Sequence, residues 1–281
     1  MKSHVYPVVL LLIALASFLI AQAVSVNAEA EPKNTIYQAM WQGDNVSGEL
    51  YVNGFIITGF KGFQSAGTSP LNPFLIGKNE IWAKVRKADT SKPARLSFGI
   101  SKLGRGDVAA TNERGNLLSI ELRDDYFKEA GIMTVGKKFE STLDFSRNLS
   151  GGEKVSEKEV IEYARHIYDL FKAKNAAGLQ KEFEVKISDY SKAYSSDNIA
   201  AEFESYMKKD LLPGKLSKIN PNKLKARKSG PNDKLWQVFE GDKELIRITS
   251  EDGSLNEMSM YIGMVDGKPR VVKLTVLTMF T

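Results

Sequence analysis

The sequence lacks cysteine and is poor in histidine. Its 281 residues include no cysteine and two histidines, His4 and His166. Without cysteine the chain has no disulfide bonds, no cysteine nucleophile and no thiolate ligand for zinc. Only His166 lies beyond residue 30, so a Ser-His-Asp triad would have to use it. These absences predict that the protein carries no metal, no cofactor and no catalytic residues.

Two further signatures of catalysis are missing. No serine lies in a nucleophile-elbow pattern, and Gly104-Arg105-Gly106 lacks the strand-to-helix context of a phosphate-binding loop. Charge is nearly balanced, with 39 basic and 34 acidic residues and a formal net charge of +5. Such a mild excess argues against nucleic acid as a partner.

The N-terminal segment has the features of a secretory signal. Lys2 precedes an apolar run over residues 8–26, and small residues follow in Ala21-Gln22-Ala23 and Ala28-Glu29-Ala30. A charged start, an apolar middle and small residues at the cleavage site define such signals. We expect residues 1–30 to direct export, most simply to the periplasm. Secretion and retention as a signal anchor are the alternatives, because the run nearly spans a bilayer.

The residue pattern changes near Ser150-Gly151-Gly152 and divides the rest of the chain there. We expect a β-sandwich domain over residues 35–146, a flexible hinge over 147–154 and an α+β domain over 155–281. A Gly-Gly pair beside serine is typical of a flexible joint. In the second domain, helices should pack on an antiparallel sheet.

Short alternating strands dominate residues 35–146. The alternation predicts strands at 35–41, 46–52, 55–60, 80–87, 94–100, 117–122 and 139–145. In the strand at 80–87, Ile81 and Val85 share one face while Trp82 and Arg86 share the other. Asn53-Gly54 is a strong two-residue hairpin signal. Several such strands joined by turns indicate a sandwich or a barrel.

Helices come first in residues 155–281 and strands follow. Ser156 with Glu159 forms a capping-box pattern that starts a helix, and further helices are expected at 176–186 and 198–212. Strands are expected at 224–228, 235–240, 244–249, 258–264 and 270–279, with turns at Gly241-Asp242, Asp252-Gly253 and Asp266-Gly267.

One stretch of the sequence is similar to a known fold. Three segments together resemble galactose-binding-like jelly-roll sandwiches. They are Tyr51-Val52-Asn53-Gly54, Pro70-Leu71-Asn72-Pro73-Phe74-Leu75 and Gly77-Lys78-Asn79-Glu80-Ile81. This resemblance implies a jelly-roll sandwich and does not by itself imply sugar binding. The order of elements in residues 155–281 resembles a cystatin-like or nuclear-transport-factor-like cone.

Two surfaces are candidates for binding. A basic segment could attract an acidic partner, or it could be a solvated loop; its members are Lys208, Lys209, Lys215, Lys218, Lys223, Lys225, Arg227 and Lys228. The second candidate is the stretch 60–70, which reads as a long loop. Phe60, Phe63 and Phe74 could form an exposed ligand platform there, or they could plug the end of the sandwich.

The sequence gives only weak signals for catalytic residues. His166 could act as a base with Glu162, but the helical periodicity places it on a polar face. Asp124-Asp125 and Glu251-Asp252 lie in turn-like sequence, where adjacent acids are usually solvated. The sequence therefore favours a non-enzymatic binding protein of the cell envelope that engages another protein or an envelope component. A carbohydrate-binding accessory protein and an unrecognised hydrolase are the alternatives.

Overall fold

The computed structural model describes residues 35–104, 116–127, 131–149 and 155–279. These residues belong to one compact unit, Asn34–Thr281. The predicted signal segment and residues 150–154 of the predicted hinge lie outside the described residues. Among the helices of the described part of the chain, none is both long enough and apolar enough to cross a membrane.

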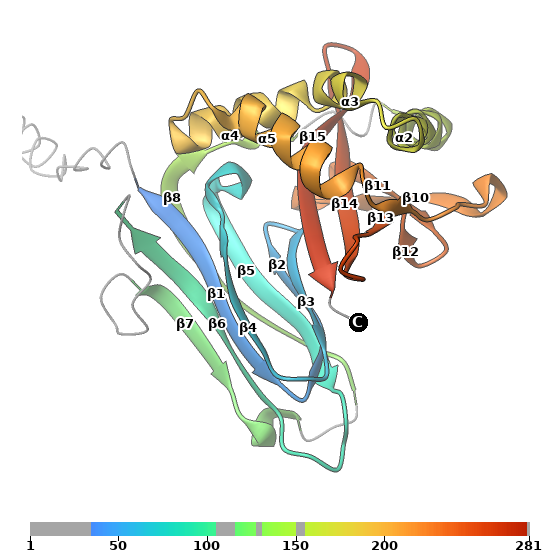
Figure 1. The fold of residues 1–281 in the computed structure, drawn as a ribbon. Helices are drawn as coiled ribbons and strands as arrows, with labels where there is room; N and C mark the ends of the chain where they lie inside the picture. Colours follow the sequence, from blue (N-terminus) through green and yellow to red (C-terminus); the bar gives the residue numbers. More distant parts are fainter. Residues whose placement is uncertain (1–34, 105–115, 128–130, 150–154, 280–281) are drawn as a thin grey trace, which may run out of the picture. The chain divides into compact units, whose positions relative to one another are not determined.

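Eight antiparallel strands form the first part of the fold, in two four-stranded sheets (Figure 1). The strands are β1 (Ile36–Asp44), β2 (Val46–Val52), β3 (Phe55–Lys61), β4 (Ser65–Pro70), β5 (Ile76–Lys87), β6 (Arg95–Leu103), β7 (Asn116–Leu122) and β8 (Met133–Asp144). One sheet has the order β4-β1-β6-β7 and the other β3-β2-β5-β8. The predicted β-sandwich-like arrangement is confirmed at this level, whereas the jelly-roll form is not.

Alternation places the sandwich core as expected. Along β5, Ile81, Ala83 and Val85 are buried, while Lys84 and Arg86 are exposed. The buried side chains of both sheets form one cluster between them. Short 3₁₀ turns, η1 (Asn72–Phe74), η2 (Asp124–Phe127) and η3 (Ser146–Asn148), connect or follow the strands.

Helices begin the second part. They are α2 (Glu157–Lys172), α3 (Ala176–Glu182), α4 (Glu184–Tyr194), α5 (Ile199–Tyr206) and a π-helical turn, η5 (Met207–Leu211). The capping box at Ser156 and Glu159 is confirmed, with each side chain bonded to the other residue's backbone amide. The helix expected at 176–186 is instead two helices. They meet at Phe183, which is fully buried.

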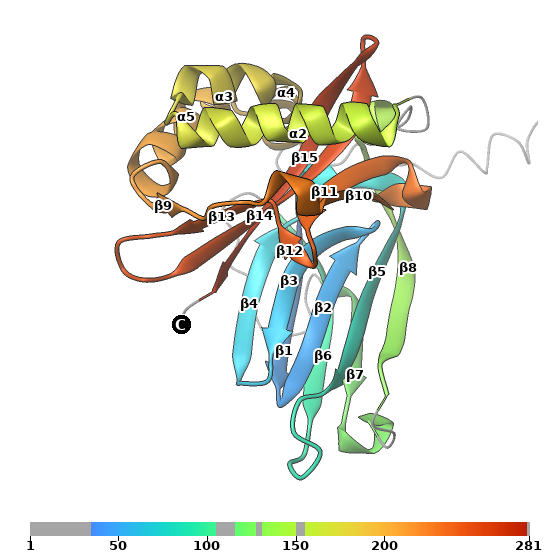
Figure 2. The same cartoon turned by 90° about the vertical axis from the view of Figure 1, so that its right-hand side faces the viewer.

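A seven-stranded antiparallel sheet follows, and the helices gather along one side of it (Figure 2). Its strands are β9 (Lys215–Leu216), β10 (Leu224–Ser229), β11 (Leu235–Glu240), β12 (Lys243–Glu244), β13 (Ile246–Thr249), β14 (Leu255–Val265) and β15 (Lys268–Met279). The 3₁₀ turns η6 (Pro221–Lys223) and η7 (Pro231–Asp233) flank β10. The strand order is β10-β11-β14-β13-β9, with β12 beside β11 and β15 beside β14. The second core lies between the helices and this sheet.

A third buried cluster joins the two parts. Phe55 and Ile56 of β3 pack with Tyr261 of β14 and Val272 of β15. The Ile56 amide donates a hydrogen bond to the Tyr261 hydroxyl at 2.8 Å. The two parts therefore share buried apolar side chains. The limits expected for two domains stay a prediction.

Candidate functional site

The β2–β3 hairpin turns at Asn53 and Gly54, whose φ values are 52° and 77°. Asparagine and glycine adopt this left-handed backbone most readily, which is why the dipeptide forms the predicted turn. Gly54 also lies against Gly230. A Cβ atom on Gly54 would lie 2.8 Å from the Gly230 carbonyl carbon and oxygen. The hairpin tip therefore touches the loop before η7, and no side chain fits at position 54 without a shift.

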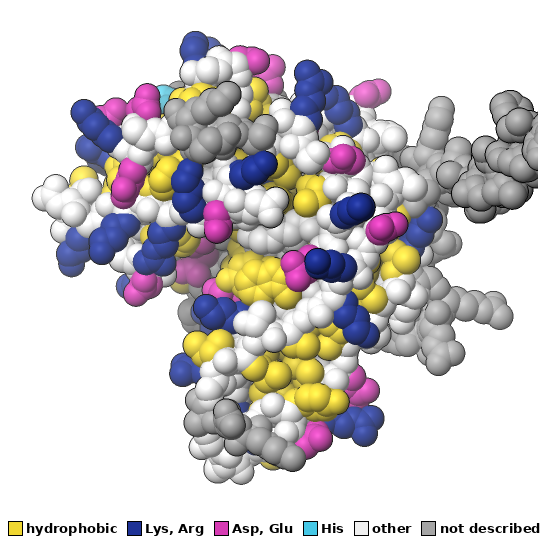
Figure 3. All heavy atoms as spheres, turned by 180° about the vertical axis from the view of Figure 1, so that it is seen from behind, with side chains coloured by type: hydrophobic (Ala, Val, Ile, Leu, Met, Phe, Trp, Pro, Cys, Tyr) yellow, Lys and Arg dark blue, Asp and Glu magenta, His cyan; other side chains and the backbone are white. Residues whose placement is uncertain are grey.

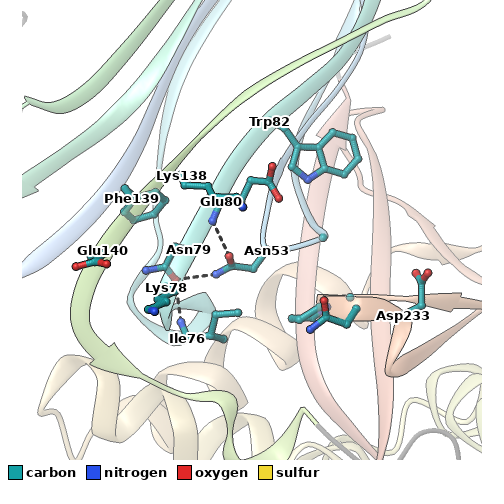
Figure 4. Close-up of a pocket in the computed structure, with 14 residues that line it drawn as sticks. Asn53, Ile76, Lys78, Asn79, Glu80, Trp82, Lys138, Phe139, Glu140 and Asp233 are labelled. Atoms are coloured by element: carbon teal, nitrogen blue, oxygen red, sulfur yellow. Dashed lines mark hydrogen bonds between the residues drawn. The ribbon is translucent and has the colours of Figure 1, made fainter.

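Two buried asparagines connect this hairpin to the start of β5 (Figure 4). Asn53 Nδ2 donates to Asn79 Oδ1 at 2.9 Å and to the Phe74 carbonyl at 2.8 Å. Asn53 Oδ1 accepts from the Glu80 amide at 2.9 Å, and Asn79 Oδ1 accepts from the Ile76 amide at 2.8 Å. Because these amide groups are engaged within the protein, they fix the wall of the site rather than bind a ligand.

A cleft of about 660 Å³ opens beside this network, between strands β5 and β8 and the η7 loop. Besides Asn53, Gly54 and Asn79, its lining comprises Ile76, Lys78, Glu80, Trp82, Lys138, Phe139, Glu140, Gly230, Pro231, Asn232 and Asp233. Figure 4 shows Glu80 and Trp82 on β5 and Asp233 on the loop across the cleft. The cleft thus combines one indole ring with three carboxylates, three amides and two ammonium groups.

Trp82 stacks on Tyr51 of the neighbouring strand. Their ring centroids are 4.0 Å apart and their planes differ by 12°. On the other side, β8 pairs Gly136 with Trp82, so the position directly opposite the tryptophan on that strand carries no side chain. A Cβ atom on Gly136 would lie 2.5 Å from the Trp82 Cβ. Tyr51 therefore stacks on the indole from one neighbouring strand, and the directly paired residue on the other neighbouring strand is a glycine.

The alternation in the sequence placed Trp82 on the strand face opposite Ile81 and Val85 but did not single it out as a site residue. The available signal was a tryptophan on the same face as Lys84 and Arg86, where a strand normally carries polar side chains. Gly136 carried no comparable signal, because the pairing of two strands is not visible in one sequence.

Acidic groups lie behind the stack. The Tyr51 hydroxyl donates to a Glu49 carboxylate oxygen, and burial together with Glu49 raises the pKa of Tyr51. Burial, with smaller contributions from Glu257 and Glu49, raises the pKa of Glu244 to about 8. The Ser259 hydroxyl donates to Glu244 Oε1 at 2.5 Å. Burial therefore favours the protonated form of Glu244.

The predicted basic segment falls on opposite edges of the seven-stranded sheet. Strand β9 forms one edge and carries Lys215, whereas β10 forms the other and carries Lys225, Arg227 and Lys228. Lys208 and Lys209 lie in η5, Lys218 follows β9, and Lys223 ends η6. Lys and Arg side chains are spread among acidic ones over the face that Figure 3 shows. Residues adjacent in sequence therefore do not all share one surface.

Several of these basic side chains already have partners. Lys208 pairs with Glu204 at 2.6 Å, and Arg227 pairs with Asp242 at 2.8 Å. Lys228 lies 3.8 Å from the centre of the Trp236 ring. Lys208 and Arg227 are thus neutralised by ion pairs, and Lys228 is packed on an aromatic ring.

The β9 side forms a different arrangement, which we call the basic hollow. Lys215 and Lys218 meet Lys172 and Lys174 from the end of α2 around a hollow of about 450 Å³. Its remaining lining is Tyr168, Phe171, Leu211, Leu212, Pro213, Gly214, Leu216 and Ile248. Within the described residues, no ion pair engages any of the four lysines and no acidic residue lines the hollow. Sequence reasoning did not link α2 to this surface.

The three phenylalanines do not form an exposed platform. Phe60 and Phe74 are buried, in the sandwich core and in the shared cluster respectively, while Phe63 is 60% exposed. The loop expected at 60–70 is also wrong in part, because β4 occupies Ser65–Pro70 and pairs with β1. The platform reading is therefore corrected: the sandwich buries two of the three rings.

His166 lies half-exposed on α2, with Nε2 3.4 Å from Glu182 Oε1. Glu182 also accepts from Arg270 at 2.9 Å and from the Tyr163 hydroxyl at 3.0 Å. The partner of His166 is thus Glu182 of the next helix rather than Glu162. The shared carboxylate ties α2, α3 and β15 together, which gives the group a structural role.

The two adjacent acid pairs stabilise turns. Asp124 binds Lys87 at 2.6 Å and accepts from the Ala94 amide at 2.7 Å. Asp252 accepts from both the amide and the hydroxyl of Ser254. These hydrogen bonds lower the pKa of each aspartate, so both remain ionised.

Among the described residues, no group of three or more histidine and carboxylate side chains is placed to hold a metal ion. Comparisons with protein-family models, with curated proteins and with solved structures gave no match.

Proposed function

We propose that this chain is a non-enzymatic binding protein of the cell envelope that holds a carbohydrate in the cleft beside Trp82. The observation that carries the proposal is the Tyr51–Trp82 stack with Gly136 beside it. Sugar rings present flat C–H faces that pack on aromatic rings, and a tryptophan already supported on one side loses little conformational freedom on binding.

Polar groups around the indole complement this choice. Glu80, Glu140 and Asp233 supply hydrogen-bond acceptors, and Asn232 supplies both a donor and an acceptor. Sugar hydroxyls need both kinds of partner at several points around one ring. The sequence predicted a protein or an envelope component as partner, and we propose that this component is a carbohydrate. The jelly-roll form of the sandwich is also part of the proposal.

Hydrolysis is less well supported than binding. A glycosidase needs two carboxylates that both reach the scissile bond, one of them with a raised pKa. Glu244 has the raised pKa, but it does not line the Trp82 cleft. The carboxylates that line the cleft, such as Glu80 and Glu140, are exposed.

The test is binding of soluble oligosaccharides, followed by tryptophan fluorescence and calorimetry. The panel comprises chito-, cello- and malto-oligosaccharides and a muropeptide disaccharide. Trp82→Ala should weaken binding of the preferred sugar at least tenfold, about 1.4 kcal/mol. Phe63→Ala removes another exposed ring as the matched control and should change nothing. If no member of the panel binds, or if Trp82→Ala binds as wild type does, carbohydrate recognition at this cleft is refuted.

Export is the second part of the proposal. The support is the pattern of residues 1–30, in which small residues follow the apolar run. Processing should occur after Ala28 or Ala30, with Ala23 as the alternative. Intact-mass measurement of protein from an exporting host tests this, and full-length chain in the membrane fraction would establish an anchor instead.

A second candidate function is binding of an acidic protein partner, and the basic hollow favours it. Lys172, Lys174, Lys215 and Lys218 have no acidic neighbour in the hollow to offset their charge. Changing all four to glutamine should slow association with an acidic partner and flatten its salt dependence. The same number of changes at Lys208, Lys223, Lys225 and Lys228 is the control. Equal effects of both sets would contradict a localised site.

A further inference from the structure

A small cavity of about 290 Å³ lies between the sandwich and helices α4 and α5, away from the Trp82 cleft. The sandwich contributes Phe74 to its wall, and the helices contribute Tyr190, Tyr194 and Phe203. Strand β15 contributes Leu274, Thr275 and Val276 to the wall, and the cavity is open to solvent. A cavity of this size and aromatic character fits one small ring rather than a chain of sugars.

Lys186 places an ammonium group in this wall. The residue is 6% exposed, and its Nζ lies 4.2 Å from the centre of the Tyr190 ring and 4.1 Å from that of Phe203. No carboxylate of the described residues pairs with it. The adjacent Asp189 carboxylate is engaged elsewhere, by Lys273 at 2.7 Å. A buried cation without a counter-ion is costly, so its retention points to an anion supplied from outside.

Thr275 gives a second, independent indication. Its Oγ1 atom is buried without a hydrogen-bond partner in the described structure, and the residue lines the same cavity. Buried polar groups normally find partners, so the unpaired Thr275 hydroxyl leaves a hydrogen bond to be made beside this cavity. Lys186 and Thr275 line the same cavity, and a carboxylate accepts hydrogen bonds from both an ammonium and a hydroxyl group.

We infer that this cavity binds a small aromatic carboxylate, with the carboxylate paired to Lys186 and hydrogen-bonded to Thr275 and the ring packed among Tyr190, Tyr194 and Phe203. The ring prefers this site because its walls are aromatic, and the carboxylate prefers it because the amine is desolvated and unpaired. This ligand class differs from the carbohydrate proposed for the Trp82 cleft, and each proposal can fail without the other.

The test compares benzoate with benzamide, its neutral isostere, by calorimetry on the full mature chain at pH 7. Benzoate should bind at least tenfold more tightly than benzamide. Burial and the charge of Lys273 lower the pKa of Lys186 to about 8, so this preference should shrink as pH rises above that value. Equal affinities, or no benzoate binding at millimolar concentration, would overturn the inference.

Variants separate charge from folding. Lys186→Met removes the charge but keeps the length, and it should fold well because it removes a buried charge. It should abolish the preference for benzoate and leave benzamide binding intact. Thr275→Val should weaken benzoate binding several-fold. Lys192→Met removes an exposed lysine of the same helix and should have no effect. Wild-type benzoate affinity in Lys186→Met would refute the site.

Discussion

Lys273 Nζ lies 2.7 Å from Asp189 Oδ2, and the lysine side chain has no exposed surface. Burial lowers the pKa of Lys273, and Asp189 opposes that shift. The pair links β15 to α4, close to the place where the sandwich joins the rest of the chain. Buried pairs of this kind add little net stability, but losing one partner leaves an uncompensated charge.

Asp189→Ala should therefore lower the free energy of unfolding by about 3–5 kcal/mol. The double variant Asp189→Leu with Lys273→Met removes both charges and should recover most of this loss, because the two side chains are then apolar. Urea denaturation of the three proteins measures the difference. A double variant as unstable as the single one would show that the pair contributes through geometry rather than charge.

Lys186 should make stability rise with pH above about 8. Its pKa is lowered to about 8, whereas the unfolded chain keeps the proton up to 10.5. Between these values the unfolded state binds more protons, so the free energy of unfolding increases with pH. Relative to Lys186→Met, wild type should gain up to about 1.4 kcal/mol per pH unit.

The useful window for that measurement is roughly pH 8 to 9.5. Burial raises the pKa values of Tyr190, Tyr194 and Tyr206, so these groups act in the opposite direction above their ordinary value of about 10. Parallel stability curves for wild type and Lys186→Met across the window would contradict the assignment.

Glu244 should have the opposite effect at lower pH. Its pKa is raised from 4.5 to about 8, mainly by burial. Between these values the folded protein holds a proton that the unfolded chain has released, so stability falls as pH rises. Neighbouring Glu257 and Glu49 strengthen the shift, while Ser259 and Arg227 oppose it. Glu244→Gln should lose this slope and exceed wild type in thermal stability near pH 8. An unchanged slope in the variant would refute the assignment.

Gly54 and Gly241 form a matched pair for testing the joint between the two parts. Both have positive φ values, 77° and 67°, so alanine strains the backbone at either position. Only at Gly54 would the added Cβ also meet another backbone segment, at Gly230. Gly241→Ala should cost about 1 kcal/mol and Gly54→Ala at least twice as much. Equal losses would show that the Gly230 backbone moves away from the added Cβ atom without a further loss of stability.

Local chemistry made much of the fold predictable. Ser156 and Glu159 specify a helix start through contacts three residues apart, and Asn53-Gly54 specifies a hairpin through its own backbone preferences. The stretch 65–70 was missed because Ser, Gly and Pro read as loop. It forms a strand because it pairs with the edge of β1. Phe183 interrupts the expected helix at a position fixed by burial, which local propensity does not encode.

The candidate site was less predictable for a similar reason. Trp82 was placed on the correct face, yet its setting depends on Tyr51 from one strand and Gly136 from another. Lys186 lay inside an expected helix, but its isolation in an aromatic wall depends on Phe203 from the next one. Pairings between distant segments create both sites, and a single sequence does not reveal such pairings.

The hydrogen bond from Ile56 to Tyr261 joins residues 205 positions apart in the chain. A ribosome makes the sandwich strands first, so Phe55 and Ile56 emerge long before the strands that bury them. Until β14 and β15 are synthesised, this apolar edge lacks Tyr261 and Val272, which pack on it in the complete fold. A chain truncated before residue 255 should therefore expose an apolar surface that is prone to aggregation. During synthesis, a chaperone or late folding of the sandwich would have to prevent that aggregation.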